Sequence, residues 1–174
     1  VVGGVAGGMS AATRMRRLDP DASIIVIERS GFVSYANCGL PYYVGGVIAD
    51  RESLLLQTPE SLDARFALDV RIGSNVLLVD QDSREVEVQG PTGEVYRLPF
   101  DFLILSPGAQ PVVPPIPGIE NAYTLRTVED VSRIALAVAN KPARAVVIGG
   151  GFIGLESAEN LIHRGIPTSI VEAQ

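Results

Sequence analysis

The sequence has very little cysteine and histidine: its 174 residues contain one of each. A single cysteine cannot form an internal disulfide, so nothing indicates a disulfide-stapled secreted scaffold, and the thiol of Cys38 is free or reactive. The one histidine, His163, is expected to end a helix as a C-terminal cation rather than to act as a base. We expect no metal site.

Long apolar runs and an excess of positive charge are also absent. No run approaches the roughly 20 apolar residues that a membrane-spanning helix needs, and the first residues lack the basic flank and cleavage site of a signal peptide. A net charge of −6 and a pI near 4.8 do not suit a surface that binds phosphate backbones or anionic lipid. We therefore expect a cytoplasmic protein with no nucleic-acid or membrane partner.

The order of predicted elements at the start of the chain indicates the fold class. A strand at Val1-Val2 runs into a glycine turn, Gly3 to Gly8, followed by a helix at Ser10 to Leu18 and a strand at Ile24 to Ile27. Apolar β-branched strands that alternate with helices are typical of a doubly wound parallel sheet. The predicted fold is therefore α/β and Rossmann-like. Because the chain opens without methionine inside one strand and stops in another, we expect truncation at both ends.

The middle of the chain predicts a small β-hairpin layer and then a linker. Two period-two segments, 85–88 and 94–97, flank the turn at 90–93. An apolar run at 102–105 ends at Ser106-Pro107-Gly108, and the proline-rich stretch 111–117 leads away from it. We therefore place a first domain at residues 1–110, and we assign 111–174 to the linker and the beginning of a second domain.

The second domain repeats the opening of the first. After a predicted helix over about 128–139, a strand at 145–148 runs into Gly149, Gly151 and Gly154, a G-x-G-x-x-G pattern that contains Phe152 and Ile153 and opens a helix to about His163. The first glycine permits the tight turn, the second lets the backbone approach a pyrophosphate, and the third lets helix and strand pack closely. The helix N-terminus then faces the phosphates with free N–H groups.

An acidic residue follows this turn at the distance a dinucleotide site needs. Glu172 ends the predicted last strand, 18 residues after Gly154, near the spacing of about 20 for the acid that accepts hydrogen bonds from the adenosine ribose. Its charge would repel a 2′-phosphate, so the site is predicted to favour NADH over NADPH. A purely structural glycine turn is the alternative.

The first glycine turn departs from the pattern at one position. Gly3 and Gly8 stand at the first and sixth places, but Val5 occupies the third. Glu28 follows Gly8 by 20 residues, at the expected distance for the ribose acid. This predicts a second dinucleotide site, with Arg29 covering the adenine or standing as a solvated charge; a turn that binds nothing is the alternative.

The cysteine lies in a segment that reads Ser34-Tyr35-Ala36-Asn37-Cys38-Gly39-Leu40-Pro41-Tyr42-Tyr43. Free cysteines are most often buried as small hydrophobes. A thiol among polar residues, before a short apolar stretch that could form a helix, would instead sit near a helix N-terminus, where the thiolate is stabilised. The residues alone leave a catalytic and a structural cysteine equally open.

The segment from Val2 to Gly46 strongly resembles the single-cysteine branch of the pyridine nucleotide-disulfide oxidoreductases, and most closely the coenzyme A-disulfide reductases and NADH-dependent persulfide reductases. Asn37-Cys38-Gly39-Leu40-Pro41-Tyr42 is the specific part, because it separates this branch from the two-cysteine glutathione-reductase type and, less sharply, from NADH oxidases and peroxidases. The likeness continues through Ser106-Pro107-Gly108 and the second glycine turn. It implies an FAD-binding domain followed by the start of an NADH-binding domain.

The resemblance also implies roles for residues. The FAD pyrophosphate would be wrapped by the first turn, Glu28 would bind the adenosine ribose, Val76 would approach the adenine, and Ser106-Pro107-Gly108 would close the first FAD segment. The turn residues are Gly3, Val5, Ala6, Gly7 and Gly8. The positions associated with coenzyme A are Ser10, Arg14, Arg17, Ser34, Asn37 and Arg65. A solvated basic helix face is the alternative for the arginines on the first helix, and a surface ion pair for Arg65.

By resemblance, NADH would reduce FAD, and the electrons would pass to sulfur at Cys38, which attacks a disulfide or persulfide. One alternative is an NADH oxidase or peroxidase in which Cys38 cycles through sulfenic acid. Another, of a different class, is a non-catalytic FAD-binding fragment of a longer chain. The resemblance implies a homodimer whose partner subunit completes the active site, so the 174-residue chain alone is expected to be inactive.

Overall fold

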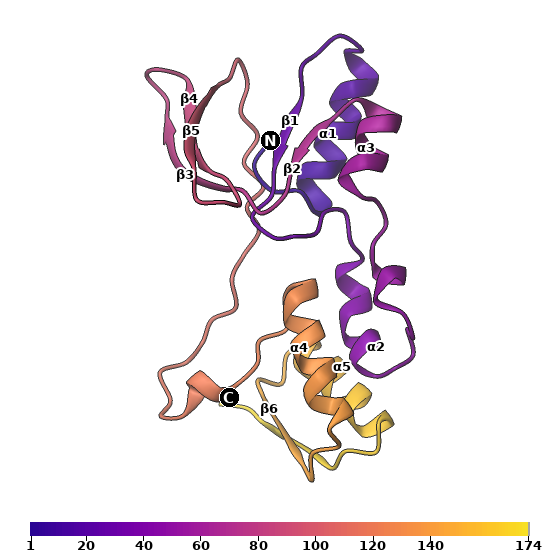
Figure 1. Cartoon of the computed structure of the whole chain (residues 1–174). Helices are drawn as coiled ribbons and strands as arrows, with labels where there is room; N and C mark the ends of the chain where they lie inside the picture. Colours follow the sequence, from indigo (N-terminus) through magenta and orange to yellow (C-terminus); the bar gives the residue numbers. More distant parts are fainter. Residues whose placement is uncertain (174) are drawn as a thin grey trace. The chain divides into compact units, whose positions relative to one another are not determined.

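The computed structural model describes residues 1–173, which form two compact units (Figure 1). The first unit contains residues 1–35 and 55–109, and the second contains residues 36–54 and the chain from 110 onward. The cysteine segment therefore packs with the second unit, although the predicted first domain includes it. The domain division at residue 110 stays a prediction about the whole protein.

A parallel sheet forms the centre of the first unit. Strand β1 (Ile25–Ile27) pairs in parallel with β2 (Asp69–Arg71). On its other side, Val2 forms parallel bridges to both Ile27 and Leu105. The neighbouring segments therefore run β2, β1, Val2, Leu105, which is the doubly wound order predicted from the alternation of strands and helices. The apolar run at 102–105 contributes only the Leu105 bridge, and Phe102 is 90 % exposed.

Two helices cover this sheet, α1 (Ala6–Leu18) and α3 (Pro59–Phe66). The fully buried side chains of Ala12 and Val26 pack in one core with Leu62 and Leu68. Small residues on α1 allow this close approach of helix and strand. Thr58 and Ser61 form a capping box that starts α3.

Arg16 joins the C-terminal ends of these two helices. Its Nε donates to the carbonyl oxygen of Phe66 at 2.8 Å and its Nη2 to that of Ala67 at 3.0 Å, at the end of α3. Its Nη1 donates to the carbonyl oxygen of Pro20 at 2.6 Å, just beyond α1. A guanidinium at two helix C-termini binds carbonyls that the helices leave without partners and complements both dipoles.

The predicted hairpin is part of a three-stranded antiparallel sheet, β3 (Asn75–Asp80), β4 (Glu85–Gln89) and β5 (Val95–Pro99). Strand β3 was not among the predicted elements. Val86 and Val88 pack against Ile27 of β1, and this contact holds the layer on the sheet. In the β3–β4 turn, hydrogen bonds from the Ser83 N–H and side chain and the Asp82 N–H lower the pKa of the Asp80 carboxyl.

The second unit begins with a 3₁₀ turn, η1 (Asn37–Gly39), α2 (Leu40–Val44) and η2 (Arg51–Leu54). After residue 110 it adds η3 (Ile119–Asn121), α4 (Val128–Ala139), β6 (Ala145–Ile148), α5 (Phe152–His163) and β7 (Thr168–Val171). Strands β6 and β7 pair in parallel. The predicted bounds of α4, β6 and the end of α5 agree with the structure. None of the helices in residues 1–173 has the length and apolar character of a membrane span.

Candidate functional site

The first glycine turn is held against the sheet by backbone contacts that require glycine. Gly3 has a φ of +98° and donates its N–H to the carbonyl oxygen of Ile27 at 2.8 Å. A Cβ on Gly8 would lie under 3.0 Å from the carbonyl oxygen of Gly3. Val2 pairs with Ile27 on one side and with Leu105 on the other, and the glycine turn follows Val2 directly. The turn therefore lies at the point where the strand order of the sheet changes direction, and ligands of doubly wound sheets bind at such a point.

The N-terminus of α1 is open to a ligand. Its N-cap, Val5, makes no side-chain capping bond, and the first turn of the helix carries no acidic residue. The first N–H groups of a helix have no intrahelical acceptor, and the helix dipole places positive charge there. Ala6 and Gly7 are exposed at this end. The turn and the helix end therefore fit the pyrophosphate of a dinucleotide.

Glu28 lies beside the same turn. Its Oε2 accepts the N–H of Gly4 at 2.7 Å, and its Oε1 accepts the N–H of Ser30 at 2.8 Å. These two bonds fix the carboxylate next to the glycine turn, where each oxygen still has a lone pair for a ribose hydroxyl. The predicted site residues did not include Gly4, because a backbone donor leaves no mark in a side-chain pattern.

The second glycine turn repeats this construction. Gly149 has a φ of +104°, and a Cβ on Gly154 would lie under 3.0 Å from the carbonyl oxygen of Gly149. The N–H of Gly150 donates to Oε2 of Glu172, as that of Gly4 does to Glu28. Helix α5 also begins without a side-chain cap or an acidic first turn. Phe152 and Ile153 are exposed at its start.

The comparison of the two turns explains the valine in the first. Gly151 stands where Val5 stands in the first turn, and a Cβ on Gly151 would meet nothing within 4 Å. The backbone at this position therefore does not need glycine in order to fold. Val5 therefore departs from the glycine pattern at a position where the equivalent residue of the second turn has room for a side chain.

Three further predicted FAD residues, Ser106, Pro107 and Gly108, follow Leu105 in the chain. Ser106 donates its N–H to the carbonyl oxygen of Val2 at 2.7 Å, and a Cβ on Gly7 would lie 3.5 Å from its Oγ. Pro107 is exposed and Gly108 has a φ of +71°. Ser106 therefore stands beside the first glycine turn.

The residues expected near the adenosine, Val76 and Arg29, lie close to Glu28 along the chain or through a backbone contact. Ser74 donates its N–H to the Glu28 carbonyl oxygen at 2.9 Å, which brings the start of β3, the strand that contains Val76, next to Glu28. Arg29 follows Glu28 and is exposed. These placements are compatible with the expected contacts.

Cys38 is exposed in η1, and the chain continues from it into the five-residue helix α2. The predicted short helix after the cysteine is therefore present. Beside it, Oδ1 of Asn37 accepts a hydrogen bond from Nη1 of Arg126 at 3.4 Å, so a cation lies one residue from the thiol. Sequence reasoning missed Arg126, because 89 residues separate it from Asn37.

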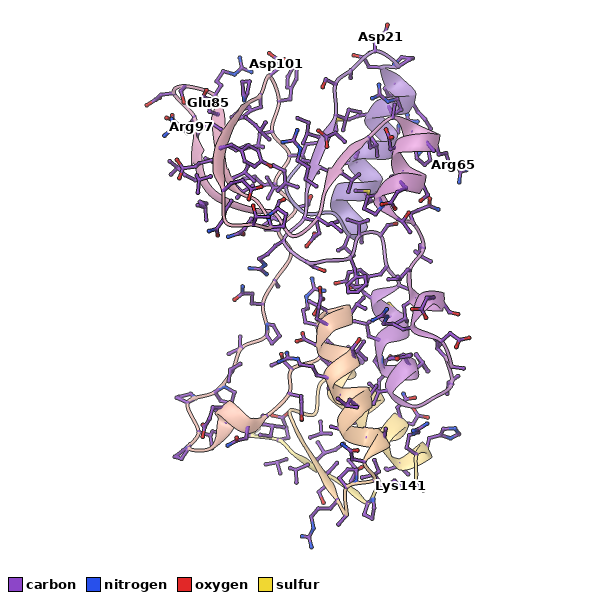
Figure 2. The ribbon with its side chains drawn as sticks, viewed as in Figure 1. Asp21, Arg65, Glu85, Arg97, Asp101 and Lys141 are labelled. Carbon is purple, nitrogen blue, oxygen red and sulfur yellow. The ribbon has the colours of Figure 1, made fainter. Side chains whose placement is uncertain are left out.

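The other predicted substrate residues lie at three places in the first unit. Ser10, Arg14 and Arg17 are exposed and follow one another at helical spacing on one face of α1. Ser34 is half-buried with a φ of +47°. Arg65 on α3 points outward (Figure 2), and its guanidinium lies 5.1 Å from the ring centroid of Phe66. Across residues 1–173, no group of three or more His, Cys, Asp or Glu is placed to hold a metal ion.

Comparison with known proteins gives one consistent result. The family model described as pyridine nucleotide-disulphide oxidoreductase matches residues 1–174. A coenzyme A disulfide reductase of Staphylococcus epidermidis is 39% identical over 168 residues, which cover 95% of this chain and 38% of the relative. The chain thus spans less than two fifths of that relative's length.

Solved structures give the same picture. The reduced CoADR-RHD of Bacillus anthracis matches with a TM-score of 0.96 and 51% identity over 98% of this chain and 32% of its own. An NAD-dependent persulfide reductase from A. fulgidus matches with 0.93 and 36%, over 97% of this chain and 32% of its own. A water-forming NADH oxidase from Lactobacillus brevis matches with 0.92 and 30%, over 98% and 38%.

Proposed function

Because the chain belongs to the pyridine nucleotide-disulphide oxidoreductase family, we propose that it is part of an enzyme that uses NADH to reduce coenzyme A disulfide or a related persulfide through Cys38. The family uses FAD and NAD(P)H, and curated relatives that are 38–39% identical are named coenzyme A disulfide reductases. Since the chain covers only 38% of such a relative, the proposal concerns the whole protein.

The observation that carries the proposal is the exposed Cys38 in the segment Asn37 to Tyr42. An exposed thiol at the start of a helical segment has access to a substrate, and its neighbour Asn37 accepts a hydrogen bond from Arg126. A binding module for FAD alone has no need of such a cysteine.

The two glycine turns supply the nucleotide sites of the proposal. Gly3 to Gly8 and the N-terminus of α1 would hold the FAD pyrophosphate, with Glu28 on the ribose. Gly149 to Gly154 and α5 would hold NADH, with Glu172 accepting from the ribose hydroxyls and repelling a 2′-phosphate. When bound, FAD supplies a two-electron carrier between the nicotinamide and sulfur.

The chemistry of Cys38 follows from its being the only cysteine in the sequence. Its thiolate attacks one sulfur of the substrate disulfide, forms a mixed disulfide and releases one thiolate product. Residues 1–174 contain no second cysteine that could resolve this bond. Two electrons and a proton, which derive from NADH, then break it, restore the Cys38 thiolate and release the second thiol. The net reaction consumes one NADH, one proton and one disulfide, and yields NAD⁺ and two thiols.

The substrate residues remain part of the proposal. Ser10, Arg14 and Arg17 on the exposed face of α1 suit the phosphates of a coenzyme A-type molecule, and Ser34 and Asn37 shortly precede the thiol in the sequence. Arg65, exposed on α3, would pair with a further phosphate. We also propose a homodimer and a cytoplasmic location, on the resemblance and the composition respectively.

The test is an NADH titration of the full-length protein under anaerobic conditions, followed by coenzyme A disulfide. We expect the flavin to be reduced by NADH and reoxidised by the disulfide, and Cys38→Ser to lower disulfide turnover by on the order of 10³-fold while FAD stays bound. Disulfide turnover that survives Cys38→Ser would refute the mechanism.

A second function has one observation in its favour, the 30% identity to a water-forming NADH oxidase. In that function the Cys38 thiolate would be oxidised to sulfenic acid and reduced again with electrons from NADH. Rapid reoxidation of the reduced protein by oxygen or peroxide, with none by the disulfide, would favour it over disulfide reduction. If the protein binds FAD but NADH does not reduce the bound flavin, the result would favour the interpretation as a non-catalytic FAD-binding fragment.

A further inference from the structure

Asn160 is unusual among the described residues, of which only Ser74 and Asn160 are both polar and buried. It lies in α5, and its exposed fraction is 4%. Its Nδ2 donates to the carbonyl oxygen of Glu156 one turn earlier, at 2.8 Å. That bond orients the amide and leaves Oδ1 directed at a different element. Burying an amide costs free energy unless it is hydrogen-bonded, and this bond offsets part of that cost.

The element that Asn160 faces is the C-terminal end of α2. Gly45 is the C-cap of α2 and is buried. A Cβ on Gly45 would lie 2.7 Å from Cγ of Asn160 and closer still to Oδ1, whereas ordinary contact begins at 3.4 Å. A Cβ on Gly46, which has a φ of +74°, would lie 2.7 Å from Nη1 of Arg164, one turn after Asn160. The end of α2 therefore rests directly on α5.

The chain between this contact and Cys38 is helical throughout. Gly39 and Leu40 have φ and ψ angles of −79°, −17° and −58°, −47°, so η1 passes into α2 without a bend. Leu40 and Val44 are buried along α2. A shift of α2 at Gly45 is therefore carried to Cys38, because no extended residue between them can absorb it.

We propose that Gly45 and Asn160 are positioning residues for the Cys38 thiol. Their close packing sets the distance between α2 and α5, and so holds the thiol in a fixed place within the unit that also carries the second glycine turn. The proposal rests on the proposed function, since a thiol without chemistry would need no fixed position. Neither residue touches substrate or cofactor in this role.

The test uses the full-length protein with FAD and the variants Gly45→Ala, Asn160→Ala and their combination. Gly45→Ala forces α2 from α5 by roughly an ångström, and a misplacement of that size costs about 10²-fold in a positioned reaction. Asn160→Ala removes the atoms that the new methyl group would meet first, so the double variant should recover part of the loss. Glu159→Ala, an exposed position on the same helix, is the matched control.

Three readouts separate positioning from folding. The first is the pH profile of Cys38 alkylation by iodoacetamide, which follows the thiolate. The second is kcat for coenzyme A disulfide, and the third is NADH oxidation with an artificial electron acceptor, which bypasses the thiol. We expect Gly45→Ala to shift the alkylation profile and to lower kcat for the disulfide about 10- to 100-fold, with artificial-acceptor activity within twofold of wild type.

Two results would overturn the proposal: a wild-type alkylation profile in both single variants, or equal losses in all activities that the double variant does not recover. If Gly45→Ala does not fold, Asn160→Ala decides alone, because it only removes atoms. A shifted alkylation profile in that variant then supports the proposal, and a wild-type profile overturns it. Failure of the proposed function looks different: wild-type protein would not reduce the disulfide, yet the alkylation profiles would still report the effect of α2 packing.

Discussion

Replacing Glu28 by alanine separates its observed role as a brace of the glycine turn from its proposed role as a ligand of FAD. The change removes the acceptors of two backbone N–H groups, those of Gly4 at 2.7 Å and Ser30 at 2.8 Å. Gly4 is buried, and a buried donor without a partner costs about 1–3 kcal/mol. We therefore expect the FAD-free protein to lose about 1–3 kcal/mol of its free energy of unfolding.

The second effect concerns the cofactor. If Glu28 accepts hydrogen bonds from the adenosine ribose, its removal costs a further ~1.5–3 kcal/mol of binding, because hydrogen bonds to charged groups contribute that much. This corresponds to a rise of about 10- to 150-fold in the dissociation constant of FAD. The two effects are measured separately, by urea unfolding of the FAD-free full-length protein and by titration of that protein with FAD.

Glu172→Ala is the matched control, since Glu172 accepts the N–H of Gly150 in the second turn as Glu28 accepts that of Gly4 in the first. It should leave FAD binding unchanged. If Glu28→Ala bound FAD within twofold of wild type while its stability fell as expected, Glu28 would only brace the turn, and its assignment to the ribose would be refuted.

Three other substitutions test further parts of the structure. Arg16→Ala should lower the free energy of unfolding by about 2 kcal/mol, because its guanidinium binds carbonyls at the ends of two helices; a loss no larger than that of the exposed Arg17→Ala, measured by urea unfolding, would contradict this. Arg17→Ala should raise KM for coenzyme A disulfide several-fold at unchanged artificial-acceptor activity, and an unchanged KM would remove this face of α1 from the substrate site. Glu172→Ala should raise kcat/KM for NADPH relative to NADH by about tenfold, since one opposing charge is lost; a constant ratio would count against the NADH assignment.

Local signals carried much of the fold. Helix α4 has the bounds predicted from the sequence, 128–139, and in the structure a capping box formed by Thr127 and Asp130 starts it. Strand β6 and the end of α5 followed from the same kind of pattern. Glu28 and Glu172 could be assigned to their glycine turns from the sequence. One helix and one strand separate each turn from its acid, and together they fix the number of residues between the two.

Other features depend on contacts between residues far apart in the sequence. Strand β3 has little alternation, and it became a strand only by pairing with β4. The Leu105 bridge, the clamp by Arg16 and the bond from Arg126 to Asn37 join segments 50 or more residues apart, where local pattern has no influence. Edge pairing and long-range hydrogen bonds are selected by the packing of the whole unit.

By itself, the sequence determined the α/β class, the two glycine turns with their acids and the single thiol, because each depends on residue type and spacing along a short stretch of chain. The tertiary structure alone decided which backbone N–H groups hold Glu28 and Glu172, that Cys38 packs in the second unit, and that Gly45 meets Asn160. These contacts join segments that are far apart in the sequence, and they form only when the chain folds.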